Sequence, residues 1–262
     1  MSLRVYTTPA VVLHRINLGE NDKILTLFTR ERGKLSAVAK GSRKPISKLA
    51  GATELFTHSR MQLAVGRSLD VITQAEIAHP FQRIRGDLTR IAYASFLTEL
   101  VERFTAERDP HAAVFDLLVE TLSVLERTPS PGLVAQLFAL RLLANLGYRP
   151  HLEDCVTCHQ AVDAEPAAFS PSLGGVLCAA HRRRHADVIP VRLDTLALAR
   201  MLLRIPPTDA AALQTLAEHA LPTVCRELDK VLRAHLQYRL ERPLRSLDFI
   251  QEIQAMDATA ST

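Results

Sequence analysis

Two hydrophobic patterns divide the chain. Up to residue 80, short stretches rich in Val, Ile, Leu and Thr are separated by turn residues, and several alternate apolar with polar positions, which is the period of a half-buried strand. These stretches predict strands at 10–16, 23–29, 34–40, 55–65 and 69–77. Five short strands in one compact unit fit a small barrel, and the OB-fold is a five-stranded barrel of this kind.

After residue 80 the apolar positions recur at helical spacing instead. One stretch, LVAQLFALRLLANLG, is apolar on most sides and ends at Gly147, which suggests a helix in the core of a helical domain. Residues 148–190 lack either period and are expected to be irregular, and the last six residues, DATAST, are expected to be disordered. Further helices are predicted over 84–104, 114–125, 193–203 and 224–240.

These patterns predict a multi-domain α+β protein. We expect an OB-fold domain at 1–80 and an α-helical domain at 81–262, with a cysteine-bearing insertion at about 150–190. No stretch approaches the roughly 20 apolar residues that span a membrane, and the first residues do not read as a signal peptide. The expected location is therefore the cytoplasm.

Positive charge is concentrated in the first part of the chain. Residues 1–80 hold 12 Lys and Arg against 6 Asp and Glu, whereas residues 81–262 hold 20 against 22. The stretch KGSRKPISK, at 40–48, carries four cations, and Gly41 and Pro45 disfavour a regular strand or helix there. Such an excess suggests a polyanionic partner, although a solvated loop without any partner is the alternative.

The cysteines have the spacing of a metal site. Cys155 and Cys158 form a Cys-x-x-Cys pair, Cys178 and His181 form a second pair, and 19 residues separate the two pairs. Two such turns can direct four ligands at one tetrahedral ion, so we expect one structural zinc per chain. For the fourth position, His159 and His185 lie close enough in sequence to compete with His181, and buried cysteines without a metal are the alternative. The neighbouring arginines, 182–184, could touch phosphate or form a solvated face.

No sequence motif indicates an enzyme. Phosphate-loop, dinucleotide-binding and serine-hydrolase motifs are absent from the sequence. His151-Leu152-Glu153 is similar to the His-x-Glu motif of zinc deaminases, but it nearly adjoins the cysteine pair, and Asp154 stands where those enzymes have a proline. Four protein ligands would also leave no position for a catalytic water.

The chain resembles the RecO family of bacterial DNA repair proteins, the recombination mediators. The resemblance rests on GKLSAVAKGSRKPISKLAGATELF at 33–56, on LDVITQAEI at 69–77, on the apolar helical middle, and on the Cys-x-x-Cys element with its Gly-Gly-x-x-Cys partner. It covers nearly the whole chain. One departure is His181, where zinc-bearing relatives commonly have cysteine, and zinc accepts either ligand.

The resemblance implies an N-terminal OB-fold, a helical domain with a zinc module, and binding of single- and double-stranded DNA. It also implies annealing of complementary strands and cooperation with RecR, so that RecA is loaded onto strands covered by single-strand-binding protein. A second hypothesis is a zinc-stabilised scaffold whose basic loop contacts an acidic protein, such as the tail of single-strand-binding protein.

Candidate contacts to DNA are the cations around two turns of the expected barrel. They are Arg30, Arg32 and Lys34 at the first turn, and Lys40, Arg43, Lys44 and Lys48 on the loop. Aromatic side chains that could stack on bases are few, and Phe28 and Phe56 are expected in the core. We therefore predict binding that is dominated by the phosphate backbone and independent of sequence.

Overall fold

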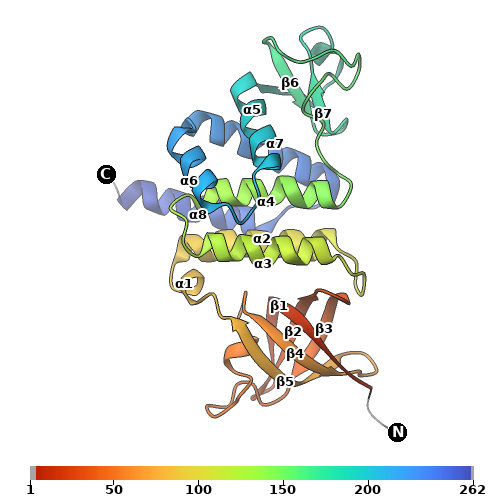
Figure 1. The fold of residues 1–262 in the computed structure, drawn as a ribbon, viewed down its shortest axis with the longest axis vertical. Helices are drawn as coiled ribbons and strands as arrows, with labels where there is room; N and C mark the ends of the chain where they lie inside the picture. Colours follow the sequence, from red (N-terminus) through yellow and green to blue (C-terminus); the bar gives the residue numbers. More distant parts are fainter. Residues whose placement is uncertain (1–3, 261–262) are drawn as a thin grey trace. The chain divides into compact units, whose positions relative to one another are not determined.

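The computed structural model describes residues 4–260, and its first part is a closed five-stranded barrel (Figure 1). The strands follow the order β1-β2-β3-β5-β4, with β4 closing onto β1. Only the β3–β5 pair is parallel among the described pairings of this barrel. The strands are β1 Val5–Leu18, β2 Asp22–Thr29, β3 Gly33–Ala39, β4 His58–Ala64 and β5 Asp70–His79. The predicted barrel is confirmed.

Alternation of side chains explains why these segments close into a barrel. On β2, Leu25 and Leu27 point inward and are fully buried, while the intervening positions face outward. β1 is long enough to pair with both β2 and β4, and its register shifts between Val12 and His14. Such an irregularity bends a strand and lets it serve two neighbours. The interior is filled by Ala10, Val12, Leu25, Leu27, Leu35, Ala37, Ala39, Met61, Leu63 and Ile72.

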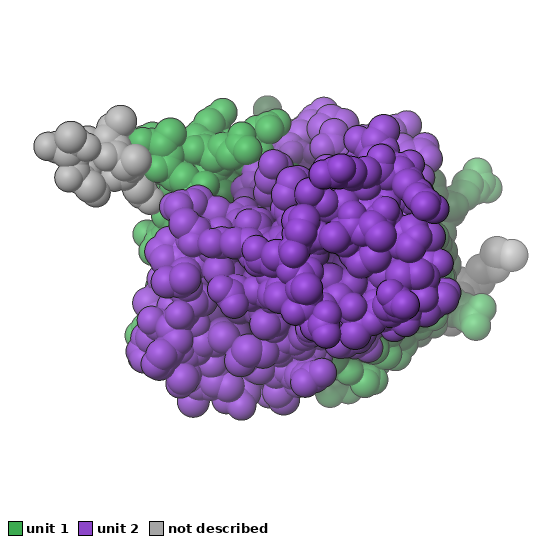
Figure 2. All heavy atoms as spheres, turned by 90° about the horizontal axis from the view of Figure 1, so that it is seen from above, with its two compact units in different colours: residues 1–127, 246–262 green, residues 128–245 purple. Residues whose placement is uncertain are grey.

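The chain folds into two compact units, which Figure 2 colours separately. Unit 1 comprises residues 1–127 and 246–262, and unit 2 comprises residues 128–245. The expected division at residue 80 follows the change from strands to helices. Unit 1 instead continues through α1, α2 and α3 and also includes α8. The helices of unit 1 are α1 Gln82–Arg85, α2 Leu88–Phe104, α3 Ala112–Leu125 and α8 Arg245–Ala260.

The helical run predicted over 84–104 is interrupted. α1 ends at Arg85, with Gly86 as its C-cap, and the side chain of Asp87 then accepts a hydrogen bond from the backbone N–H of Arg90, which caps the start of α2. α3 covers part of the barrel through Phe115, whose ring centroid lies 6.1 Å from that of Phe28. Phe28 therefore belongs to a buried contact, as the sequence predicted.

Unit 2 is built around α4 Pro131–Asn145, most of which is buried. α5 Leu193–Arg204, α6 Ala210–His219 and α7 Pro222–Leu240 pack against it. A small antiparallel sheet in the order β7-β6-β8 lies between α4 and α5 in the sequence. Its strands are β6 Ala167–Ser170, β7 Gly175–Leu177 and β8 Ile189–Val191. The expectation of an irregular segment at 148–190 was therefore wrong in part, because strands of three or four residues are too short to show a period.

The end of the chain also departs from expectation. α8 runs to Ala260, so residues 257–260 are helical rather than disordered, while residues 261–262 lie outside the described part. The start of α8 is held within unit 1, because the backbone N–H and the hydroxyl of Ser246 both donate to Glu99 on α2, at 2.8 and 2.6 Å. None of the described helices is both long and apolar enough to cross a membrane.

Candidate nucleic-acid interface and metal centre

The basic stretch at 40–48 is a loop made of successive turns. After β3 ends, the N–H of Lys44 donates to the carbonyl of Gly41 at 3.2 Å, and the N–H of Ser47 donates to the carbonyl of Lys44 at 3.0 Å. Gly41 has φ +63°, a left-handed conformation that glycine adopts without strain. The loop leads to a short 3₁₀ turn, η1 Gly51–Thr53, before β4. Its backbone is therefore locally ordered.

The same loop is attached to the turn between β1 and β2. The N–H of Gly41 donates to the Asp22 carboxylate at 2.7 Å, and the N–H of Arg43 donates to the carbonyl of Asn21 at 2.9 Å. The Arg43 guanidinium also donates to the carbonyl of Gly19 at 3.0 Å. These hydrogen bonds fix the backbone of the loop against the end of the barrel, so the loop side chains project from an ordered backbone.

Four cations project from this loop into solvent. All four side chains are exposed, and within residues 4–260 none of them forms an ion pair with a carboxylate. They are Lys40, Arg43, Lys44 and Lys48. Ile46, between them, is 93% exposed. Unneutralised cations on a held loop create a positive potential that attracts polyanions.

Arg30 and Arg32, the first two candidate cations, already have partners. Arg30 forms a bidentate ion pair with Asp116 on α3, in which Nε and Nη2 donate to the two carboxylate oxygens at 2.9 and 3.0 Å. The Arg32 guanidinium lies 3.9 Å from the centroid of the Tyr6 ring. Burial and a hydrogen bond to Asp70 raise the pKa of Tyr6. Both arginines remain exposed, so they stay candidates, but binding a phosphate would compete with these contacts.

Lys34 is held more firmly than either arginine. Its ammonium donates to the carbonyl of Thr105 at 2.7 Å and to the carbonyl of Glu102. Burial lowers the pKa of Lys34. The neighbouring Gly33 is needed at this place, because a Cβ there would lie 2.0 Å from the carbonyl oxygen of Asp109. Lys34 thus joins the barrel to the segment after α2, and it is the weakest of the candidate DNA contacts.

The candidate cations form two groups rather than one continuous patch. In the β2–β3 hairpin, Thr29 pairs with Gly33 at the end near Arg30, whereas Lys23 pairs with Ala39 at the end near the basic loop. A strand of this length separates the two ends by about 20 Å. A strand of DNA that touched both groups would have to run along the outer face of β2 and β3, which is the ligand-binding face of OB-folds.

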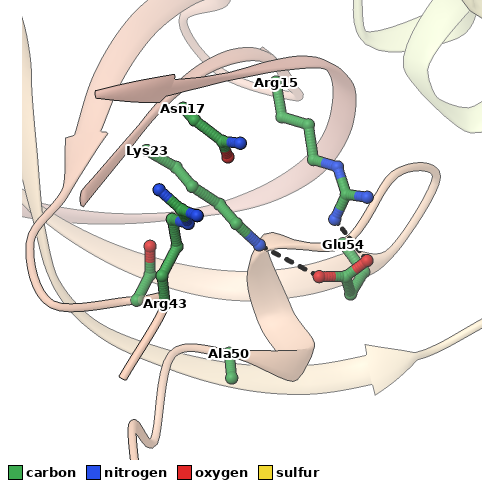
Figure 3. A pocket seen from close by; sticks show the side chains of 7 residues that line it. Arg15, Asn17, Lys23, Arg43, Ala50 and Glu54 are labelled. Carbon is green, nitrogen blue, oxygen red and sulfur yellow. Dashed lines mark hydrogen bonds and ion pairs between the residues drawn. The ribbon is translucent and has the colours of Figure 1, made fainter. Parts of the chain in front are cut away.

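A polar pocket lies beside the basic loop (Figure 3). In the close-up, the side chains of Arg15 and Lys23 converge on Glu54, and dashed lines mark the two ion pairs. Sequence reasoning missed these residues. The available signal was Lys23, a charged residue at the same inward parity as Leu25 and Leu27 on β2. The cavity measures about 460 Å³ and is lined by Arg15, Asn17, Lys23, Ser42, Arg43, Ala50 and Glu54.

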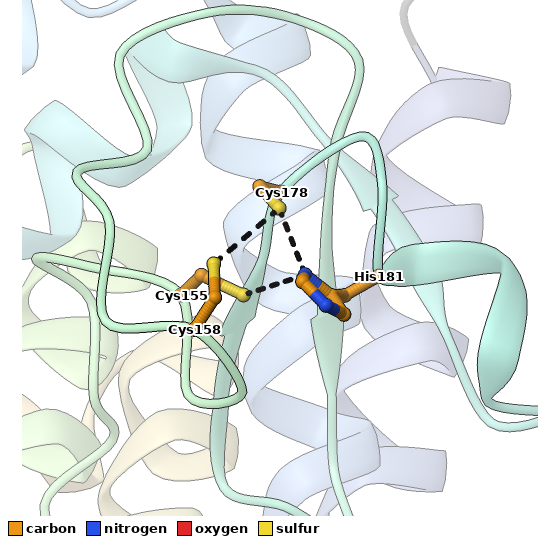
Figure 4. Close-up of side chains that lie close together, drawn as sticks. All are labelled: Cys155, Cys158, Cys178 and His181. Atoms are coloured by element: carbon orange, nitrogen blue, oxygen red, sulfur yellow. Dashed lines mark hydrogen bonds between the residues drawn. The ribbon is translucent and has the colours of Figure 1, made fainter.

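In unit 2 the structure brings the four predicted metal ligands together (Figure 4). One ligand atom from each residue lies within 4.8 Å of all the others. The sulfurs of Cys158 and Cys178 are 3.9 Å apart, and His181 Nδ1 lies 3.3 Å from the sulfur of Cys178 and 3.9 Å from that of Cys155. Tetrahedral zinc with ordinary bond lengths separates two sulfurs by about 3.8 Å, and a sulfur and a nitrogen by about 3.6 Å. The cluster can hold a metal ion of this kind.

Backbone contacts around Gly175 place the first cysteine pair beside the second. The N–H of Val156 donates to the carbonyl of Val176 on β7 at 3.0 Å, and Cys178 directly follows this strand. A Cβ on Gly175 would lie 2.5 Å from Val156 Cγ1 and 2.8 Å from the carbonyl oxygen of His151. Only glycine permits this approach, so the Gly-Gly sequence of the hairpin serves the cluster directly.

The competing histidines stand outside the cluster. His159 is 78% exposed, and its Nδ1 lies 3.7 Å from the Asp154 carboxylate. His185 follows the 3₁₀ turn η2 Arg182–Arg184 and lines a separate cavity together with Asp187 and Tyr238. Among the described residues, His181 is therefore the histidine whose position matches the three cysteines.

The environment of Cys155 favours the thiolate that binds metals. Its burial raises the pKa, but backbone N–H groups of Cys178, Thr157 and Cys158 outweigh this effect and lower the pKa to about 6. The deaminase-like residues nearby are engaged elsewhere, since the Glu153 carboxylate pairs with Arg200 at 3.2 Å. The arrangement is that of a closed four-ligand site, which suits a structural ion.

Comparison with known proteins agrees with these features. Residues 1–81 match the family model described as recombination protein O N terminal, and residues 85–248 match recombination protein O C terminal. The DNA repair protein RecO of Heliobacterium modesticaldum is 38% identical over 255 residues, which cover 96% of this chain and 91% of that protein. RecO of Pelotomaculum thermopropionicum is 39% identical, with 95% of this chain and 94% of that protein covered. With the barrel, the helical region and the cysteine cluster in the same order, the chain belongs to the RecO family of DNA repair proteins.

Proposed function

We propose that this protein is a DNA-binding recombination mediator. It binds single- and double-stranded DNA, anneals complementary strands and, with RecR, helps to load RecA onto single strands coated by single-strand-binding protein. The observation that carries the DNA-binding part is the held loop with its four exposed cations, Lys40, Arg43, Lys44 and Lys48, none paired with a carboxylate within the described chain. Family membership supports the repair role.

Contacts to phosphate account for annealing better than contacts to bases would. Phe28 and Phe56 are buried and cannot stack on bases, and Tyr6 lies beneath Arg32. Lysines on the loop act as mobile point charges, and Arg43 adds a planar donor. A strand held by its backbone keeps its bases free to pair with a complementary strand. The charge of two approaching strands is neutralised at the same time.

We test the loop by changing Lys40, Arg43, Lys44 and Lys48 together to Ala. The matched control removes four exposed cations of unit 2, Arg149, Arg226, Lys230 and Arg242, so that both variants lose the same charge. Titrations of a fluorescent single strand at several salt concentrations measure affinity and its salt dependence. The loop variant should lose affinity, and its slope of log K against log salt should shrink by up to about 0.7 per lost contact.

The control variant should keep a slope close to that of the wild type, because its cations lie outside the loop. If the loop variant retained both the affinity and the slope of the wild type, the loop would not be the DNA contact. Circular dichroism checks that both variants are folded, which is expected because all eight side chains are exposed.

We also propose that the metal of unit 2 is zinc and that its role is structural. The three sulfurs and one imidazole nitrogen of Cys155, Cys158, Cys178 and His181 are ligands that zinc prefers, and four protein ligands leave no open position. When bound, the ion would tie the Cys-x-x-Cys turn to the segment that follows β7. The one-per-chain stoichiometry rests on this single cluster within residues 4–260.

A second candidate function is favoured by Ile46. This side chain is 93% exposed between cations, and an acidic peptide with an apolar residue would use both features. In this alternative the protein is a zinc-stabilised scaffold whose basic loop contacts an acidic protein rather than DNA, and the acidic tail of single-strand-binding protein would be the target. Changing Ile46 to Ser separates the two functions, since peptide binding should weaken markedly while phosphate-dominated binding of single strands should change little.

A further inference from the structure

The pocket beside the basic loop contains a buried hydroxyl without a partner. Ser42 is 1% exposed, it lines the cavity, and its Oγ has no hydrogen-bond partner among the described residues. Burying a polar group without a hydrogen-bond partner is unfavourable, so such groups are rare in folded proteins. Because the Oγ itself is not accessible to solvent, donation to a ligand in the cavity would require the Ser42 side chain to rotate about its Cα–Cβ bond.

The cationic side of the same pocket is held in place before any ligand arrives. Lys23 is 9% exposed in its side chain, and its ammonium lies 3.0 Å from one Glu54 oxygen, while Arg15 binds the other oxygen. Burial raises the pKa of Glu54, but hydrogen bonds and charge from Lys23 and Arg15 outweigh this and lower it. The carboxylate thus stays ionised and fixes two cations at one wall of the cavity.

These cations keep donors that no described contact uses. Each guanidinium has five N–H groups. Arg43 has a described bond through one nitrogen, to the carbonyl of Gly19, and Arg15 has a described bond through one nitrogen, to Glu54. Arg15, Lys23 and Arg43 carry three positive charges against the single negative charge of Glu54, which leaves a net charge of +2. A planar guanidinium matches the geometry of a phosphate.

We propose that this pocket binds a phosphate monoester. A monoester carries a charge of about −1.5 to −2 near pH 7, which matches the pocket, whereas an internal phosphodiester carries only one charge. The cavity of about 460 Å³ lies within the size range of small-ligand pockets and leaves room for the sugar next to the phosphate. The source of the monoester is the phosphorylated end of a DNA strand or a free nucleotide. The strand-end source rests on the proposed DNA-binding function.

The test compares two single strands of one sequence, with and without a 5′-phosphate, together with free dAMP. The variants are Ser42→Ala and Arg15→Gln, and Ser68→Ala is the control, an exposed serine of the β4–β5 turn. Wild type should bind the phosphorylated strand several-fold more tightly than the unphosphorylated strand. Both pocket variants should lose this preference while still binding the unphosphorylated strand, and Ser68→Ala should keep it.

Ser42→Ala is informative because it should not harm the fold. Removing a hydroxyl that has no partner leaves no other group unsatisfied, so the melting temperature should stay the same or rise. If the strands bind equally but dAMP binds wild type and fails to bind Ser42→Ala in calorimetry, the pocket holds free nucleotides and the strand-end source is wrong.

If neither the 5′-phosphate nor dAMP distinguishes wild type from the pocket variants, the proposal is overturned. That result leaves the loop experiment untouched, because the loop variant is read out on unphosphorylated strands. Conversely, a protein that binds no DNA but binds dAMP through Ser42 would refute the proposed function and retain the phosphate pocket.

Discussion

At the scale of single residues, lysine side chains differ in exposure and in bonding partners from one position of the barrel to another. Lys44 is exposed on the loop, Lys34 is held by two carbonyl groups, and Lys23 is buried beside Glu54. The sequence marks Lys23 as unusual, because it occupies an inward-facing position of the alternating strand β2. The partners of Lys34 lie 68 and 71 residues away in the sequence, so no local pattern indicates them. The exposure of the loop cations was therefore predictable, and the engagement of Lys34 was not.

His235 gives a residue-scale prediction about pH. Burial lowers its pKa, and the nearby Arg239 adds to this effect, although bonds to the backbone at Tyr148 and Pro171 oppose it. The folded protein therefore binds a proton at His235 less readily than the unfolded chain does. Stability should fall as pH drops below the ordinary histidine value of about 6.5, by at most about 1.4 kcal/mol per pH unit from this group.

Chemical denaturation at pH 7.5 and 5.5 measures this effect. His235→Gln should be less stable than wild type at pH 7.5, because its contacts with Tyr148 and Phe169 change. It should lose less stability on acidification than wild type does. The control His14→Gln changes an exposed histidine, and this variant should lose as much stability between pH 7.5 and 5.5 as wild type does. Equal acid sensitivity of wild type and His235→Gln would show that His235 does not carry this dependence.

At the scale of elements, the small sheet of unit 2 depends on what surrounds it. β6, β7 and β8 have only three or four residues each, which is too short for a sheet to be stable by itself. The sequence predicted the metal ligands but not the sheet. Cysteine spacing is a local property, whereas β8 joins β6 from 19 residues further along the chain.

Removing the proposed zinc ion should loosen this sheet. Elemental analysis should find about one zinc per chain in wild type and almost none in Cys178→Ser. The matched control is Cys225→Ser, which changes a half-buried cysteine outside the cluster. Hydrogen exchange should accelerate at 151–191 in Cys178→Ser or after chelation, because the ion no longer joins the two turns.

The barrel should keep its protection, and affinity for single strands should change little, since the loop cations belong to unit 1. A metal-free protein with unchanged exchange at 151–191 would argue against a structural role for the ion.

At the scale of the whole molecule, the chain leaves unit 1 after residue 127 and returns to it at residue 246. α8 is bound to α2 by Ser246 and Glu99, and by Gln254, which donates to the Tyr93 hydroxyl at 3.1 Å. Unit 1 is thus completed only when α8 has joined it. The division into strand and helix regions, read from periodicity, did not reveal this return.

Two buried isoleucines test the contribution of α8. Ile250 and Ile253 are 2% and 4% exposed, so changing both to Ala should lower stability by several kcal/mol, at about 2–5 kcal/mol for each buried side chain. The control changes Gln251 and Glu252, exposed on the same helix, to Ala. Denaturant titration measures stability, and hydrogen exchange should accelerate in α2 for the isoleucine variant only. An unchanged midpoint would mean that α8 adds nothing to unit 1.

The sequence by itself determined the barrel strands, the main helices, the three clustered cysteines and the family, and the structure decided that His181 is the histidine beside them. Each of these follows from the local hydrophobic periodicity, from the short spacing between cysteines, or from the similarity of the sequence to a known family. Only the tertiary structure decided which candidate cations are engaged, because the partners of Arg30 and Lys34 come from distant segments. It also placed Arg15, Lys23, Ser42 and Glu54 around one pocket, since closing the barrel and folding the loop over its end brings residues of β1, β2 and the β3–β4 connection together.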